Sequence, residues 1–85
     1  MITTIEGKKT IIKFAYDGNA TGCGLYDFET KENFGIAVVT RHSKDKPNRV
    51  KARKAALAKA LKPYSREIRT AVWNDVARQM RMITV

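Results

Sequence analysis

The stretch RHSKDKPNRVKARKAALAKALK, residues 41–62, contains the boundary at which this chain changes from strand to helix. Upstream of it, β-branched and aromatic residues are frequent. From Arg49 onward the sequence is rich in alanine, lysine and arginine, which favour helices. Pro47 helps to end the polar segment between the two, and the side chain of Asn48 can accept a bond from a free backbone N–H at a helix start. The stretch therefore predicts a polar loop followed by a capped helix.

Two helices are predicted from this boundary onward. The first begins at Arg49 and is ended by Pro63, and the second is capped by Ser65 and runs over residues 66–81. At about 100° per residue, the apolar side chains of the first helix and its end fall on one narrow stripe. These side chains are Val50, Leu57, Leu61 and Tyr64.

Three strands are predicted upstream, over residues 8–16, 23–30 and 34–40. The first shows apolar side chains at alternate positions, which is typical of a strand with one buried face. Asp17-Gly18-Asn19 favours a tight turn, and the small residues from there to Leu25 favour a loop. The sequence thus predicts an α+β fold, a three-stranded antiparallel β-meander followed by two α-helices packed on one face (β-β-β-α-α).

The length of 85 residues allows one small domain, residues 1–85, and the composition of 44% hydrophobic and 29% charged residues is typical of a soluble globular protein. No apolar run approaches the ~18 residues that cross a bilayer, and the N-terminus does not read as a secretory signal. The one cysteine, Cys23, cannot form a disulfide within the chain, which fits a reducing compartment. We therefore expect a cytoplasmic protein that does not enter a membrane.

The charge is distributed unevenly along the chain. Residues 41–85 hold thirteen Lys or Arg against three acids, whereas residues 1–40 hold four Lys against five acids, so the whole net charge of +9 lies in the C-terminal half. Like charges along a helix repel one another, which destabilises the helix. A bound anion would reduce this repulsion, so anion binding is expected to stabilise the folded chain. The sequence therefore predicts binding to a polyanion or to an acidic protein surface.

The residues expected to make this contact lie in the polar loop and the first helix, where Lys51, Lys59 and Lys62 share a face with only alanines between them. The predicted binding residues are Arg41, Lys44, Lys46, Arg49, Lys51, Arg53, Lys54, Lys59 and Lys62. Base edges are read mainly by Arg, Asn and Gln, so a face of lysine and alanine predicts contact with phosphate rather than sequence-specific recognition.

Aromatic side chains offer a second mode of contact with nucleic acid. Tyr26 and Phe28 would stack on single-stranded bases if they lay on the sheet face that turns away from the helices. The alternative is that both belong to the core.

Nothing in the sequence assembles a catalytic site. Cys23 and His42 are of the types that form a nucleophile and its base, but a buried thiol and a loop histidine account for them more simply. One cysteine and one histidine cannot build a metal cluster. We expect a protein that is not an enzyme and holds no cofactor or metal.

The segment NRVKARKAALAKAL, residues 48–61, resembles the final-helix signature of double-stranded RNA-binding domains. In those domains a basic cluster at the helix start precedes alternating Ala, Lys and Leu, after a three-stranded sheet. The resemblance implies that Arg49, Lys51 and Arg53 approach phosphates across a groove. That family also has a helix before its sheet, whereas only about seven residues precede the first predicted strand here.

The order of short strands, the segment GIAVV at residues 35–39, a polar loop and a basic alanine-rich helix is similar to small accessory proteins encoded by bacteriophages. This resemblance implies a protein of the host cytoplasm that acts by stoichiometric binding.

Two hypotheses follow for the function. The first is a non-enzymatic nucleic-acid-binding module that contacts the backbone of DNA or RNA through its basic helix. The second is a phage-type accessory protein that binds an acidic or nucleic-acid-binding groove on a host protein and inhibits or redirects it. A three-stranded sheet would also leave an open edge through which a homodimer could pair.

Overall fold

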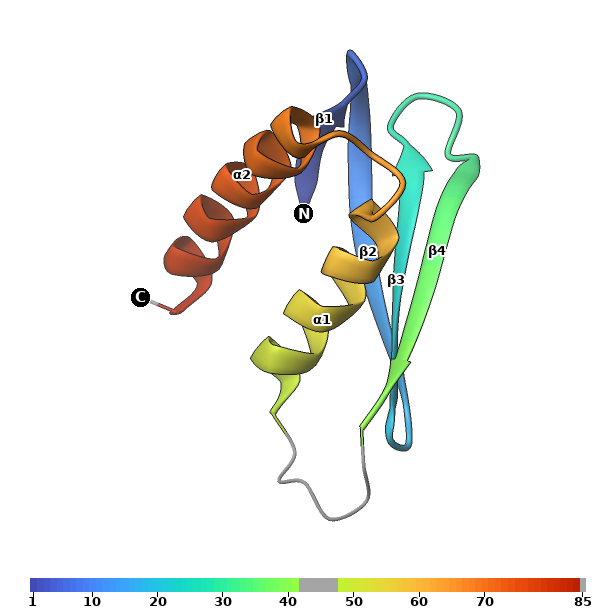
Figure 1. Ribbon diagram of the computed structural model, residues 1–85, viewed down its shortest axis with the longest axis vertical. Helices are drawn as coiled ribbons and strands as arrows, with labels where there is room; N and C mark the ends of the chain where they lie inside the picture. Colours follow the sequence, from blue (N-terminus) through green and yellow to red (C-terminus); the bar gives the residue numbers. More distant parts are fainter. Residues whose placement is uncertain (42–47, 85) are drawn as a thin grey trace.

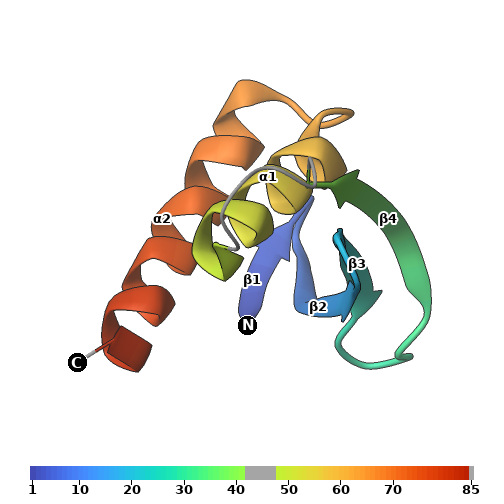
Figure 2. The same cartoon turned by 90° about the horizontal axis from the view of Figure 1, so that it is seen from below.

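The computed structural model describes residues 1–41 and 48–84. They form one antiparallel sheet with the strand order β1-β2-β3-β4, followed by two helices that lie on the same side of the sheet (Figures 1 and 2). The elements are β1 (Ile2–Ile5), β2 (Lys8–Asp17), β3 (Ala20–Asp27), β4 (Asn33–Thr40), α1 (Arg49–Leu61) and α2 (Arg66–Thr84). The predicted α+β class, antiparallel sheet and two helices are confirmed, but the predicted number of three strands is wrong.

The strand that was not predicted is β1, which pairs with β2 so that Ile2 lies opposite Ile11. The two strands are joined by the turn Glu6-Gly7, in which both residues have positive φ (51° and 78°). Positive φ at both central residues is typical of the hairpin turn that matches the twist of paired strands. The four residues of β1, Ile-Thr-Thr-Ile, are too few and do not alternate between apolar and polar, so they show no strand period. The sequence did contain one indication of a hairpin, since Gly7 lies between two segments rich in β-branched residues.

The small residues that were expected to form a loop are instead the first half of β3. A tight turn at Gly18, whose φ is +57°, connects β2 to β3. In β3 the side chains of Thr21, Cys23 and Leu25 are all buried at alternate positions. The loop prediction is wrong because this alternation, rather than the small size of the intervening residues, decides the local structure.

The strand β3 ends at Asp27, three residues earlier than predicted, and Phe28 lies in the turn that follows. Oδ1 of Asp27 accepts hydrogen bonds from the N–H groups of Glu29 (2.8 Å) and Thr30 (3.0 Å). A carboxylate that bonds to the backbone two and three residues later starts a turn. The bonds from Thr30 and then Glu29 hold the pKa of Asp27 below its usual range.

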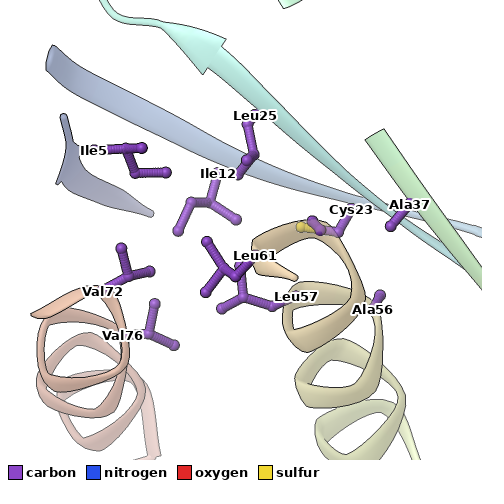
Figure 3. Close-up of a cluster of buried hydrophobic side chains, with 11 residues drawn as sticks. Ile5, Ile12, Cys23, Leu25, Ala37, Ala56, Leu57, Leu61, Val72 and Val76 are labelled. Carbon is purple, nitrogen blue, oxygen red and sulfur yellow. The ribbon is translucent and has the colours of Figure 1, made fainter. Parts of the chain in front are cut away.

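One hydrophobic core lies between the sheet and the two helices. In Figure 3, side chains from β1, β2 and β3 point toward side chains from α1 and α2. The buried residues are Ile5, Ile12, Cys23, Leu25, Ala37, Ala56, Leu57, Ala60, Leu61, Val72 and Val76. Helix α1 packs on β3 and β4, and α2 packs on β1. The two helices thus divide the inner face of the sheet between them.

Helix α1 begins as predicted, because the side chain of Asn48 accepts a hydrogen bond from the N–H of Lys51 at 3.0 Å. Its buried side differs from the predicted stripe. Ala56 and Ala60 are buried beside Leu57 and Leu61, whereas Val50 is 41% exposed. Small side chains let a helix approach its neighbour closely. The two alanines therefore turn the helix so that Val50 leaves the core, and its predicted place in the core is wrong.

Helix α2 is tied to the edge of β1 by polar side chains. Oε1 of Gln79 accepts from the N–H of Ile2 at 2.9 Å, and Nε2 of Gln79 donates to the carbonyl of Ile2 at 2.7 Å. This pair of bonds resembles the pair that an adjacent antiparallel strand would make. The hydroxyl of Thr3 also donates to Oδ2 of Asp75 at 2.8 Å. The edge of the sheet at β1 is therefore partly occupied by α2.

Candidate nucleic-acid interface

Three lysines, two from α1 and the third its C-cap residue, lie together on the solvent side of the helix. Lys51, Lys54 and Lys62 are exposed, and at about 100° per residue they fall within an arc of about 80° that has Ala58 in its middle. Within the described residues, no hydrogen bond or ion pair engages their ammonium groups. The segment that forms α1 contains no acid. We call this surface, Lys51, Lys54, Ala58 and Lys62, the lysine face of α1.

The first turn of α1 has an unfavourable charge. It contains no acidic residue, while Arg49 and Lys51 are both cationic. The N-terminal end of a helix carries a partial positive charge that favours anions and disfavours cations by roughly 0.3–1 kcal/mol each. An external anion at this end of α1 would therefore relieve a repulsion that the described residues of the protein leave in place.

Two predicted binding residues lie at the end of the molecule where β2 turns into β3. Arg41 donates from its backbone N–H to the carbonyl of Asn19 and from Nη2 to Oδ1 of the same residue, both at 2.7 Å. The guanidinium of Arg49 lies 4.9 Å from the centroid of the Tyr16 ring. Because Tyr16 and Asn19 flank one turn, the two arginines lie close to the same end of the sheet. The predicted residues Lys44 and Lys46 lie outside the described residues.

Two further predicted residues, Arg53 and Lys59, do not belong to the lysine face. Arg53 is half-buried, and its Nε is buried without a hydrogen-bond partner among the described residues. Lys59 is exposed and donates from Nζ to the carbonyl of Val38 in β4 at 2.9 Å. A lysine at an edge strand is one way in which proteins limit strand pairing. The homodimer through an open edge stays a prediction, and β4 is the edge to which it applies.

The sheet face opposite the helices, which we call the outer face, carries Tyr26. A Cβ built on Gly24 would lie 2.6 Å from Cε2 of Tyr26, so the ring rests directly on the Gly24 backbone. Gly24 lies between the inward-facing Cys23 and Leu25, and its missing side chain would point outward. Nζ of Lys13 lies 5.3 Å from the centroid of the same ring. Tyr26 therefore fulfils the condition set by the sequence, since it is half-buried on the face away from the helices.

Phe28 lies beside this face in the turn after β3. Its ring centroid is 4.0 Å from Nζ of Lys9 and 4.5 Å from Nζ of Lys31. A cation over an aromatic ring is favourable by roughly 0.5–1 kcal/mol at an exposed site. Sequence reasoning considered the two aromatic residues but missed the lysines beside them. The pairing of β2 with β3 brings Lys13 opposite Gly24, and this register was not predictable from either strand alone.

The described residues contain no group of three or more His, Cys, Asp or Glu side chains that could hold a metal ion. A hollow of about 510 Å³ is lined by residues of β1 and α2 together with Gly7 and Lys9. Its carboxylate, Asp75, is engaged through both oxygens, by Thr3 and by Arg78. This carboxylate therefore serves as a tertiary contact. Of the two described helices, neither is of the length and hydropathy that crossing a membrane requires.

The thiol of Cys23 is fully buried in the core, and burial raises its pKa from 9.0 to about 11. Between pH 9 and 11 the thiol therefore stays protonated in the folded state but ionises in the unfolded chain. Stability from this group is complete below pH 9 and is lost as the pH rises toward 11. A protonated, buried thiol is a poor nucleophile. The buried thiol agrees with the simpler account of Cys23 given by the sequence, and His42 lies outside the described residues.

This ionisation gives a measurable pH dependence. At pH 10 the unfolded-state ionisation of Cys23 should lower the free energy of unfolding by about 1.4 kcal/mol relative to pH 7. Urea denaturation of the unmodified protein and of Cys23→Ala at both pH values measures this loss, because other groups titrate alike in the two proteins. A difference between the two proteins that does not change with pH would show that the thiol does not titrate as described.

No match was found in a scan against models of known protein families, in a search of curated proteins or in a search of solved structures.

Proposed function

We propose that this protein is not an enzyme and binds the backbone of nucleic acid through the lysine face of α1, largely without sequence specificity. One observation carries the proposal. Three exposed ammonium groups share one side of a helix that contains no acid, and no described residue pairs with them. A row of lysines of this kind suits successive phosphates, which are negatively charged and regularly spaced.

The energetics of α1 support an anionic ligand. Arg49 and Lys51 oppose the helix dipole in the first turn, and the lysines of the exposed face repel one another. A solvated surface of mixed charge would avoid both the unfavourable interaction with the helix dipole and the repulsion between lysines. Phosphates placed along the lysine face would remove them, so binding would stabilise the helix as well as the complex. Arg49 and Arg41 extend the basic surface at the end near the β2–β3 turn.

The composition of the lysine face supports binding without sequence specificity. Its members are lysine and alanine, and it has none of the Arg, Asn or Gln side chains that read base edges in the described structure. Lysine contacts to phosphate position a ligand but carry no sequence information. The resemblance to double-stranded RNA-binding domains points to the same part of α1 as a surface for phosphates.

Fluorescence anisotropy of labelled single- and double-stranded DNA and RNA, at about 50 and 200 mM salt, tests the proposal. If the three lysines of the face each meet a phosphate, affinity should fall over this range about 40-fold for duplex DNA and about 20-fold for single strands. Absence of binding at about 50 mM salt would refute the proposal. It would favour the second hypothesis, a phage-type accessory protein that uses its basic surface on an acidic host protein. That hypothesis requires saturable one-to-one binding to a protein.

A further inference from the structure

The outer face of the sheet exposes apolar side chains that the core does not use. Ile2, Ile36 and Val38 are 43%, 72% and 48% exposed. Each is paired with an outer-face position of the neighbouring strand, namely Ile11, Gly24 and Gly22 respectively. No described helix covers this face (Figure 2). Exposed apolar side chains gathered on one face of a protein mark a binding surface.

The β3 part of this face carries two glycines, Gly22 and Gly24. Lys13, Gly24 and Ile36 form one row across β2, β3 and β4, and Ala15, Gly22 and Val38 form the next. Because glycine has no side chain, a ligand can approach the backbone closely at these positions. The ring of Tyr26 lies on the backbone of Gly24, the middle member of the first row. A planar group could therefore stack on this ring without meeting a bulky neighbour on β3.

The charge of the outer face favours an anionic occupant. Lys9 and Lys13 lie on it, because they alternate with the inward-facing Thr10 and Ile12, and both have their ammonium groups beside aromatic rings. Asp17, the last residue of β2, falls on the same face by this alternation, so the face carries two lysines of β2 against one acid. Glu29 lies in the turn after β3. A second copy of the chain stacked on the same face would bring the like-charged lysines of two proteins of net charge +9 together.

We infer that the outer face binds single-stranded nucleic acid, with a base stacked on Tyr26 and with Lys9 and Lys13 at the adjacent phosphates. Stacking needs an exposed base face, which a single strand offers and a duplex does not. When a base takes the place of the Lys13 ammonium over the ring, the flexible lysine stem lets the ammonium move to a phosphate. The inference rests on the proposed function for the class of ligand, but its residues lie on the side of the sheet opposite α1.

The test separates base stacking from charge. Anisotropy titrations compare labelled probes of about 12 nucleotides, namely single-stranded DNA, single-stranded RNA, an abasic single strand of the same length, and duplex DNA. The protein should bind the base-bearing single strands about tenfold more tightly than the abasic strand, which carries the same charge. The DNA and RNA probes show which of the two sugars the face prefers.

Substitutions in β3 then place the effect on Tyr26. Tyr26→Leu should remove the tenfold preference for bases and leave binding to the abasic strand unchanged, whereas Tyr26→Phe should keep the preference. Gly24→Ala should weaken the preference, because its Cβ would displace the ring that now lies 2.6 Å away. Gly22→Ala is the matched control, since its Cβ would meet only backbone oxygens at 3.9 Å. Circular dichroism melting verifies that each variant is folded.

Equal binding of base-bearing and abasic strands by the unmodified protein would overturn the inference and leave the proposed function intact. A preference that survives in folded Tyr26→Leu and in Gly24→Ala would also overturn it. Failure to bind any probe, the abasic strand included, would refute the proposed function itself. A concentration-dependent dimer that Ile36→Lys dissociates, without a preference for bases, would instead assign the outer face to a second copy of the chain.

Discussion

The variant K51Q/K54Q/K62Q should bind nucleic acid about a hundredfold more weakly than the unmodified protein at about 50 mM salt. Each exposed phosphate contact contributes roughly 1 kcal/mol at low salt, and the variant loses three of them. The slope of the logarithm of affinity against the logarithm of salt concentration should become shallower by about 2.7. Anisotropy titrations at several salt concentrations measure both quantities. Glutamine is a good helix former, so α1 should remain folded.

The control for this variant removes the same charge from another surface. Arg66, Arg69 and Arg78 are exposed on α2, so R66Q/R69Q/R78Q has the same net charge as the lysine variant. Arg78 is paired with Asp75, but an exposed ion pair contributes only about 0–1 kcal/mol to stability. We expect the control to lose less than about threefold in affinity. Equal losses in both variants would show that overall charge, rather than the lysine face, determines binding.

Leu57→Ala should lower the free energy of unfolding by about 2–5 kcal/mol. Leu57 is fully buried where α1 meets the sheet, and its removal leaves a cavity among the side chains shown in Figure 3. A chain of 85 residues has roughly 4–13 kcal/mol of stability in total. The loss is therefore a large fraction of what holds the domain folded. Urea denaturation should show a lower midpoint with little change in the slope.

Val50→Ala is the matched control on the same helix. Sequence periodicity placed Val50 beside Leu57 in one apolar stripe, whereas the structure leaves it 41% exposed. Its substitution should cost less than about 0.5 kcal/mol, since alanine has the higher helix propensity and little burial is lost. A cost equal to that of Leu57→Ala would mean that α1 is rotated as the sequence stripe implied.

Both helix starts and the end of α1 were predictable because local chemistry fixes them, whereas α2 continues to Thr84, three residues beyond its predicted end. Asn48 caps α1 through its own side chain, and Pro63 prevents its continuation, so neither depends on distant residues. The strands were harder to predict. β1 is only four residues long, and the first half of β3 is built from small residues that also occur in loops. Their positions are set by pairing with β2, which is a contact between strands and not a property of either segment alone.

The basic surface was predictable as a set of residues but not as a geometry. Arg53 and Lys54 were both expected beside the apolar stripe, yet Arg53 is half-buried and Lys54 is exposed. The burial of Ala56 and Ala60 sets the rotation of α1, and alanine carries too weak a signal to reveal this. For Tyr26, strand alternation separates it from Leu25 but does not say which of the two apolar residues faces the helices. Only the packing of α1 against β3 decides that question.

The bonds between Gln79 and Ile2 join residues 77 positions apart, which has a consequence for how the chain folds. The hairpins of β2, β3 and β4 need only short loops to close, whereas this contact needs nearly the whole chain. A chain emerging from the ribosome can therefore form the hairpins of β2, β3 and β4 first. Strand β1 has β2 as its one neighbour, and its other edge stays uncovered until α2 has been synthesised. The residues of β1, although made before those of α2, are thus among the last described residues to reach their native surroundings.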